Sequence, residues 1–538
     1  MCQAINLLVD CSHQYSFNLS WADRTQDEIF PGIQCLTSGR TIHKMDLAPI
    51  NVLVVLGRGL LAYLPDDADH ILKYVEQGGG LYISVSLGSE YDDSLNAFLQ
   101  NFGVTAYSTL DNDPDKQKVF MPLDHPAALQ EYNIGKNSNQ VSLEYNTSDW
   151  EHIYESDSAV AATIYRSCGK GQIIIDTLAI YDNAIGQKES YAKAMRKMIE
   201  YLATTKHVEK IASGGGWQFS EGYRWDLIHT TNSGLRIHHN EYTLKQVEQD
   251  IKAYHATVDY LKEITGLDEN DKATQIRINN ENHLDPDQPD ENSVDYVPAG
   301  ILFQIKYLAC IGAGFLLPQG AAVDIPPTLK NDWQVHLGML SHEMGHAWSF
   351  PFCEVMGEES SAFIFNNLVL NHHYGRNHED SVTKRLMRYL EKNDFDDDDL
   401  AKERSDFKYY MFIDLMIRVY GEGIWKNYNL LKFALLNQKE SEWTPHTTAW
   451  LWSIAAGQDV FSWFNTAFSS SVDKTMAKLP QQALTLGFDP IAIAKQYHVP
   501  LQKLSVKRDI FTKLHSFSDV REFYERELAK KGYPDSEG

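Results

Sequence analysis

The stretch SHEMGHAWSF at 341–350 contains two histidines four residues apart, with a glutamate directly after the first. Residues four apart on a helix project from the same face, one turn from each other. His342 and His346 can therefore be two ligands of one tetrahedral zinc ion. Glu343 can serve as the general base that takes a proton from a zinc-bound water. The pattern is short, so an ordinary helix with two unconnected histidines is the alternative.

The sequence around these residues predicts a helix over 331–350. Its apolar residues recur at helical spacing and form one stripe: Trp333, Leu337, Leu340, Met344, Ala347 and Trp348. Pro326 and Pro327 precede the helix, and Pro351 ends it because proline cannot continue the helical hydrogen-bond pattern. A helix in this position would carry both histidines on one face.

A second helical run, GEESSAFIFNNLVL (357–370), follows the second histidine closely. It resembles the segment that supplies the third zinc ligand, a glutamate, in thermolysin-type zinc peptidases. The resemblance assigns this ligand to Glu359, with Glu358 as the rival, and a solvated carboxylate at a helix start is the alternative. Phe363 stands where those peptidases usually carry a polar residue, which leaves the orientation of the ligand histidines to another partner. The small residues 360–362 would let the two helices approach closely.

The combined segment HEMGHAW…EESSAFIFNNL resembles the enhancin-like zinc metallopeptidases, which include viral enhancins and bacterial mucin-degrading peptidases. The stretch 415–435 is similar to that family's helix after the metal site, and 452–480 is similar to the region where a helix packs beneath the catalytic cleft. The resemblance spans roughly 215–490. It implies a gluzincin-type peptidase with one catalytic Zn2+, which hydrolyses peptide bonds of O-glycosylated, mucin-like glycoproteins by a Glu-activated zinc-bound water.

Peptide hydrolysis also needs a hydrogen-bond donor for the oxyanion that forms on the substrate carbonyl. Four aromatic residues of the predicted helical region are candidates for this role: Tyr409, Tyr410, Tyr420 and His446. Trp348, close to the second histidine, is a candidate for stacking on a sugar. For each of these residues, a structural role in the core is the alternative.

The first 200 residues alternate short apolar runs with helical patterns, which predicts an open α/β sheet. The segments 50–59 and 81–86 are typical of buried strands, and 159–180 indicates two strands around a glycine-rich turn. The combination resembles the class I glutamine amidotransferase-like fold, a flavodoxin-like layered structure. That family needs a nucleophilic cysteine after a central strand, and here only Ser84 or Ser86 could replace it. We therefore expect a non-catalytic accessory domain.

These patterns predict a multidomain chain. An α/β flavodoxin-like, amidotransferase-like domain is expected at 1–208. An α+β, mostly helical, thermolysin-like zincin domain is expected at 209–500, with a helical lower subdomain from about 370. A C-terminal helical segment is expected at 501–538. The domain pair is similar to the TRP-channel-associated factor group, so the alternative function is a non-catalytic zinc-binding interaction or regulatory protein.

The 538 residues carry a formal net charge of −25, which disfavours a nucleic-acid partner because phosphate backbones attract basic surfaces. No apolar run is long enough for a transmembrane helix. The six cysteines form no CxxC pair, which disfavours a structural zinc cage. The first residues do not form a signal-peptide pattern. We expect a secreted or cell-surface protein whose signal has been removed, and a cytoplasmic protein is the alternative. The expected partner is a protein substrate.

Overall fold

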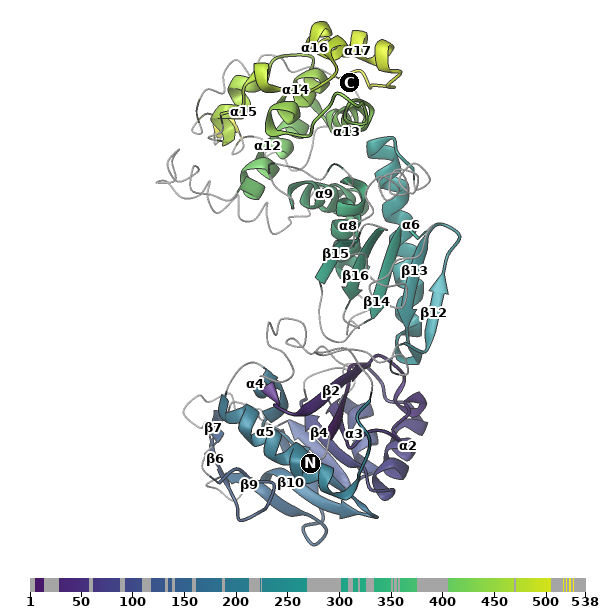
Figure 1. Cartoon of the computed structure of the whole chain (residues 1–538), viewed down its shortest axis with the longest axis vertical. Helices are drawn as coiled ribbons and strands as arrows, with labels where there is room; N and C mark the ends of the chain where they lie inside the picture. Colours follow the sequence, from purple (N-terminus) through teal and green to yellow (C-terminus); the bar gives the residue numbers. More distant parts are fainter. Residues whose placement is uncertain are drawn as a thin grey trace.

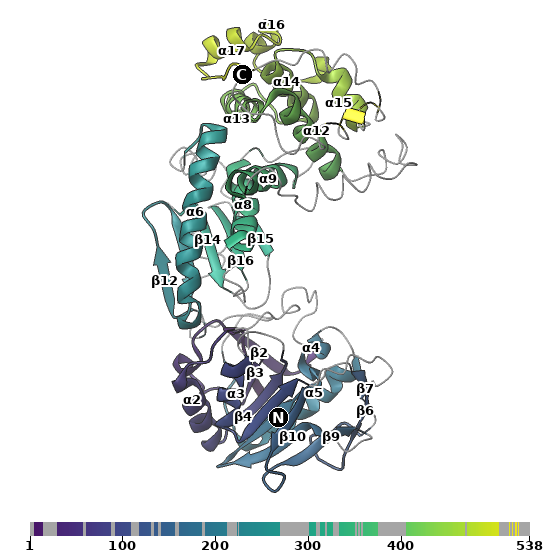
Figure 2. The ribbon, with the colours of Figure 1, turned by 180° about the vertical axis from the view of Figure 1, so that it is seen from behind.

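The computed structural model describes residues 5–13, 29–57, 61–87, 92–108, 118–130, 134–137, 141–156, 161–185, 189–211, 225–268, 301–307, 313–317, 320–325, 333–349, 359–374, 405–468 and 471–504, with the single residues 223, 352, 356, 516, 519, 522, 523 and 526. Three parts follow one another along the long axis in Figures 1 and 2: a domain with a mixed sheet, a smaller sheet with its helices, and a group of helices. The chain is therefore multidomain, with an N-terminal mixed α/β domain and a mostly helical C-terminal part, as the sequence predicts.

Five parallel strands form the centre of the N-terminal sheet. They are β1 (Ile5–Asp10), β2 (Ile33–Ser38), β3 (Val52–Gly57), β4 (Gly80–Val85) and β11 (Gly171–Asp176). Their order across the sheet is β2-β1-β3-β4-β11, and each neighbouring pair is parallel. This is the 2-1-3-4-5 strand order of flavodoxin-like sheets, in which the direction of winding reverses between β1 and β3. The two strands predicted at 50–59 and 81–86 are confirmed.

These strands are buried because helices cover both faces of the sheet. The helices are α2 (Pro65–Glu76) and α3 (Asp92–Gln100) on one face, and α4 (Ile180–Ile185) and α5 (Glu189–Leu202) on the other. Successive residues of a strand point to opposite faces. Val54 of β3 accordingly packs with α4 and α5, and Val55 packs with α2 and α3. Both side chains are fully buried.

Antiparallel strands extend the sheet beyond β11. They are β10 (Ala161–Cys168), β9 (Glu151–Ser156), β6 (Lys118–Pro122) and β7 (Ile134–Asn137). β10 and β11 form a hairpin, which confirms the two strands predicted at 159–180. A separate antiparallel pair is made by β5 (Val104–Ser108) and β8 (Val141–Tyr145).

The second sheet has the strand order β12-β13-β14-β16-β15. Its strands are β12 (Leu227–Thr230), β13 (Leu235–His239), β14 (Phe303–Tyr307), β15 (Ala313–Leu317) and β16 (Gly320–Ile325). β13, β14 and β16 are parallel, and the edge strands β12 and β15 are antiparallel to their neighbours. The helices α6 (Leu244–Thr265) and α8 (Trp333–Ser349) pack against this sheet and against each other.

The C-terminal part is helical. Its helices are α9 (Ser360–Tyr374), α12 (Ser405–Tyr420), α13 (Gly423–Leu436), α14 (Pro445–Ala456), α15 (Phe461–Phe468), α16 (Gln481–Leu486) and α17 (Pro490–Tyr497). The stretch 415–435, expected as one helix, is divided between α12 and α13 at Gly421. The φ angle of Gly421 is 82°, in the left-handed region that commonly ends a helix. Trp452 of α14 stacks on Tyr428 of α13 with ring centroids 4.0 Å apart, which joins these helices in one core.

Most of the C-terminal segment predicted at 501–538 lies outside the described residues, as does Glu358. Among the residues that the structure describes, no helix has both the length and the apolar character needed to cross a membrane.

Candidate metal centre

Two successive helices bring the candidate ligands together. α8 carries His342, Glu343 and His346, and it confirms the first predicted helix. Glu359 directly precedes α9, and its carbonyl oxygen accepts a hydrogen bond from the amide of Phe363 at 3.0 Å. The second predicted helix also forms, with Glu359 at its N-terminal boundary rather than inside it.

One carboxylate oxygen meets both imidazoles. Oε2 of Glu359 lies 3.1 Å from Nε2 of His342 and 3.4 Å from Nε2 of His346. The two imidazole rings are nearly perpendicular, with centroids 5.1 Å apart. All three side chains are partly exposed. The three potential donor atoms therefore converge on one point that solvent can reach.

The pKa values of the two carboxyl groups of the site are shifted in opposite directions. Burial raises the pKa of Glu343 above its usual range, although His342 and His346 oppose this rise. The pKa of Glu359 is held well below its usual range, because the two imidazoles form hydrogen bonds with its carboxylate. Glu359 is therefore ionised and can serve as an oxygen ligand, whereas Glu343 lies in desolvated surroundings beside it.

α8 and α9 approach closely because one of the facing residues is a glycine. A Cβ atom on Gly345 would lie 2.8 Å from Cα of Ala362 and 3.0 Å from Cβ of Phe365. Residues 360–362 are buried at the start of α9. The prediction that these small residues allow a close approach is confirmed. The approach brings Glu359 within reach of the histidines.

A side-chain amide bridges the same two helices. Asn366 of α9 donates to the carbonyl oxygen of Gly338 and, at 3.0 Å, to the hydroxyl of Ser341, both on α8. Ser341 directly precedes His342, so the bridge holds α9 beside the turn that carries this ligand. Sequence reasoning did not single out Asn366. The available signal was a pair of amides inside the otherwise apolar run SSAFIFNNLVL.

Phe363 packs against one of the ligand histidines. Its ring centroid lies 4.8 Å from that of His342. Tyr410 of α12 stands edge-on to Phe363 at 6.5 Å, and its hydroxyl accepts a hydrogen bond from Asn367 at 3.2 Å. The imidazole of His342 is thus restrained on this side by ring packing, where the thermolysin-type pattern would place a polar residue.

Two of the candidate substrate-contacting residues are buried in the helical core. The side chain of Trp348 is 1% exposed, and its Nε1–H donates to Oγ1 of Thr265 at 3.1 Å. Tyr409 is fully buried; its hydroxyl lies 3.0 Å from that of Tyr428 and accepts from Nε1 of Trp452 at 3.0 Å. The expectation of a sugar-stacking role for Trp348 and of an oxyanion role for Tyr409 is therefore corrected, because side chains so enclosed do not reach a substrate.

The other three candidates also have structural partners. Tyr420 is 2% exposed and bonded to the side chain of Gln458, and Tyr410 is fully buried. His446, in the first turn of α14, accepts a hydrogen bond from the amide of Asp473 at 3.0 Å. The structure thus brings the ligand candidates of α8 and α9 together. It buries Tyr410 and Tyr420 in the core, so the expected oxyanion role is corrected for these two residues as well.

The cluster of His342, His346 and Glu359 can hold a metal ion. One ligand atom from each residue lies within 4.8 Å of the others. Two imidazole nitrogens and a carboxylate oxygen are a common donor set for divalent transition metals. The arrangement therefore fits a metal, and it does not by itself select one.

No protein-family model matches the chain, and no curated protein matches it. Among solved structures, an exo-β-1,4-mannosidase from Opitutaceae bacterium strain TAV5 is 8% identical, with 38% of this chain and 36% of that chain covered and a TM-score of 0.24. A cytoplasmic protein from Salmonella typhimurium is 12% identical, with 37% of this chain and 98% of that one covered and a TM-score of 0.25. The chain thus spans about a third of the length of the mannosidase. TM-scores this low carry no argument about its activity.

Proposed function

We propose that this chain is a zinc-dependent endopeptidase. The observation that carries the proposal is the meeting of His342, His346 and Glu359 at one point, with Glu343 on the same helix as the histidines. A purely structural metal site would not need a carboxylic acid at position 343, next to one of the metal ligands. The combination supports hydrolysis by an activated water.

The donor set fits zinc. Catalytic zinc sites commonly use two histidines and one glutamate and keep the fourth position open. The partial exposure of His342, His346 and Glu359 is compatible with such an open position. When bound, zinc would supply Lewis-acid polarisation of the scissile carbonyl and a lower pKa for the attacking water.

The protein's own residues would supply positioning and proton transfer. Glu343 follows His342 directly on α8 and would accept the proton of the attacking water, then pass it to the leaving amine. His342 is held by the ring of Phe363, and Glu359 is held by the start of α9. These contacts keep the ligand atoms in place before a substrate arrives.

The finer fold assignment belongs to the same proposal. The flavodoxin-like strand order supports an amidotransferase-like accessory domain. The mixed five-stranded sheet with α6, α8 and α9 supports a thermolysin-like zincin arrangement. The enhancin-like family, a secreted or cell-surface location and O-glycosylated protein substrates rest on the motif resemblance alone.

Glu343→Gln tests the proposal directly. This substitution keeps the size of the side chain but removes the proton acceptor. We expect the variant to retain stoichiometric zinc and to lose at least about 100-fold in the rate of cleavage of a mucin-type glycoprotein. Mass spectrometry of new peptide termini measures cleavage, and elemental analysis measures zinc.

Wild-type protein treated with a chelator is the control, and it should lose cleavage together with its zinc. Undiminished cleavage by Glu343→Gln would overturn the proposed mechanism. Stoichiometric zinc in a wild-type protein that cleaves no glycoprotein would favour the alternative, a non-catalytic zinc-binding interaction protein.

A further inference from the structure

The carboxyl edge of the N-terminal sheet is the place where open α/β sheets bind ligands. Such ligands lie at the point where the strand order reverses, which here falls between β1 and β3. Asp10 is the last residue of β1 at this edge, His13 follows it, and Tyr63 comes after β3. This group of residues, at the position where such sheets have their ligand crevice, is called the switch-point crevice below.

A tyrosine from the second part of the chain lies in the switch-point crevice. His13 is 1% exposed, and its ring is stacked on Tyr63 with centroids 4.2 Å apart. On the same histidine, the ring of Tyr242 lies at a centroid distance of 3.8 Å. Burial raises the pKa of Tyr242 well above its usual range, as expected for a phenol removed from water. Tyr242 lies in the short 3-10 helix Glu241–Thr243 that leads into α6, so it reaches the crevice from the other sheet domain.

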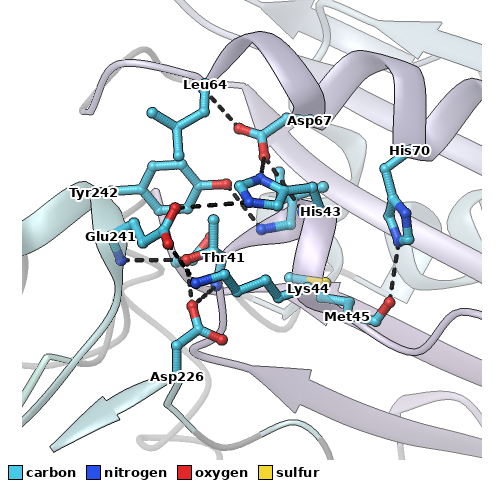
Figure 3. A network of polar contacts seen from close by, with 12 residues as sticks. Thr41, His43, Lys44, Met45, Leu64, Asp67, His70, Asp226, Glu241 and Tyr242 are labelled. Atoms are coloured by element: carbon cyan, nitrogen blue, oxygen red, sulfur yellow. Dashed lines mark hydrogen bonds and ion pairs between the residues drawn. The ribbon is translucent and has the colours of Figure 1, made fainter.

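Two backbone groups and one side-chain hydroxyl of the loop after β2 form hydrogen bonds with the same segment. The amide of Ile42 donates to the hydroxyl of Tyr242 at 2.8 Å. Nδ2 of Asn240 donates to the carbonyl oxygen of Gly39 at 3.0 Å, and the amide of Glu241 donates to Oγ1 of Thr41 at 3.2 Å. In Figure 3 the backbone nitrogen of Glu241 meets Thr41, and Tyr242 lies beside the same loop. Three consecutive residues, 240–242, therefore each form a hydrogen bond with the N-terminal domain.

A second anchor comes from the residue before β12. Oδ2 of Asp226 accepts from the amide of Thr41 at 2.7 Å, and Oδ1 of Asp226 accepts from Nε of Arg40 at 3.0 Å. Trp225 packs over Gly39, where a Cβ atom would lie 3.0 Å from Nε1 of the indole. The loop after β2 is thus held from two sides by residues of the second part.

Charged groups border this contact. Nδ1 of His43 lies 2.9 Å from the buried carboxylate of Asp67, and its Nε2 lies 3.6 Å from Glu241. Lys44 also pairs with Glu241 (Figure 3). Because His43, Lys44 and Glu241 are partly exposed, these ion pairs are screened by salt and add specificity rather than most of the strength.

We propose that the switch-point crevice is an interaction surface whose occupant is the chain's own segment 240–242. Among the residues that the structure describes, the ring of Tyr242 lies on His13, so a small ligand that contacted His13 there would have to displace this ring. The segment therefore takes the place of a ligand and clamps the N-terminal domain to the second sheet in one orientation. This inference is independent of the proposed peptidase activity.

Hydrogen exchange of the full-length protein tests the clamp. In Tyr242→Ala the amide of Ile42 should exchange at least about tenfold faster than in the wild type, because its acceptor is the hydroxyl of Tyr242. The amide of Thr41, which donates to Asp226 in the same interdomain contact, should also exchange faster because the contact loosens. Amides of β3 should be unchanged. Tyr107→Ala is the matched control, since Tyr107 is 48% exposed on β5, and it should leave Thr41 and Ile42 at wild-type rates.

Tyr242→Phe covers the case in which Tyr242→Ala does not fold. It removes only the hydroxyl group, so faster exchange should be confined to Ile42, the residue that donates to it. Wild-type exchange of Ile42 in both Tyr242 variants would overturn the proposal. Equal acceleration throughout β3 would also overturn it, because the tyrosine would then stabilise the whole domain rather than a docking contact.

Discussion

Glu359 has two roles at one position. Its carbonyl oxygen closes the first turn of α9, and its carboxylate meets both ligand histidines. Because the backbone at a helix start has a defined geometry, the direction of the carboxylate depends on where α9 begins. His342 is held in a different way, by the ring of Phe363. The orientation of one candidate ligand, Glu359, thus depends on the backbone at the helix start. The orientation of another, His342, depends on side-chain packing.

Glu359→Gln should lower the affinity of the protein for zinc by more than about 100-fold. Substitution of a residue that only hydrogen-bonds to a metal ligand can already lower the affinity by about 100-fold, and Glu359 is proposed as a ligand itself. A neutral amide is a much poorer oxygen ligand for zinc than a carboxylate. Competition with a chromophoric chelator measures the affinity. Glu358→Gln is the matched control and should bind zinc like the wild type. The opposite order of the two affinities would assign the ligand role to Glu358.

The close packing of α8 against α9 brings the candidate metal ligands together. Gly345 lets the two backbones approach, and Asn366 of α9 bonds to the turn before His342. Interiors are close-packed, so a methyl group added at such a contact forces one helix to move. The glycine between the two histidines of HEMGH therefore serves the packing of α8 against α9.

Gly345→Ala should lower the free energy of unfolding by about 1–3 kcal/mol, because its Cβ would lie 2.8 Å from Cα of Ala362. Gly338→Ala on the same helix is the matched control. Its nearest neighbour is 3.9 Å away, so this change should be neutral or stabilise the protein by up to about 1 kcal/mol. Urea unfolding of the metal-free variants measures both effects. Equal losses at the two positions would contradict the steric explanation.

The whole molecule consists of two sheet-based parts and a helical part in series (Figures 1 and 2). The candidate metal centre lies on the helices that follow the second sheet. The N-terminal sheet instead uses its carboxyl edge to hold residues 240–242 of the second part. The candidate metal centre and the carboxyl edge that contacts residues 240–242 thus lie in different parts of the chain.

Removal of the metal should therefore affect one part of the molecule more than the other. Zinc at 100 times its dissociation constant would stabilise the native state by about 2.7 kcal/mol. Its ligands join α8 to the start of α9, so a chelator should speed amide exchange in these helices. Exchange in β1 and β3 should not change. Hydrogen exchange with and without chelator measures this, and equal changes in both parts would contradict it.

Much of the fold follows from local patterns. Continuous apolar runs predicted the buried strands β3 and β4, and helical spacing predicted α8 and α9. The interruption at Gly421 was missed, because a glycine inside a helical pattern does not always end the helix. The separation between α12 and α13 depends on how each helix packs against its neighbours.

The sequence by itself determined the spacing of His342, Glu343 and His346 and the helix that carries them, because both depend on residues within a few turns. Only the tertiary structure decided that Glu359 meets the two histidines, since the two helices must first pack. The same holds for Trp348, which the packing of α6 and α8 turns into the core. The chain also gave no local sign that Tyr242 would enter the crevice of a distant sheet, because such a contact exists only when both surfaces have folded.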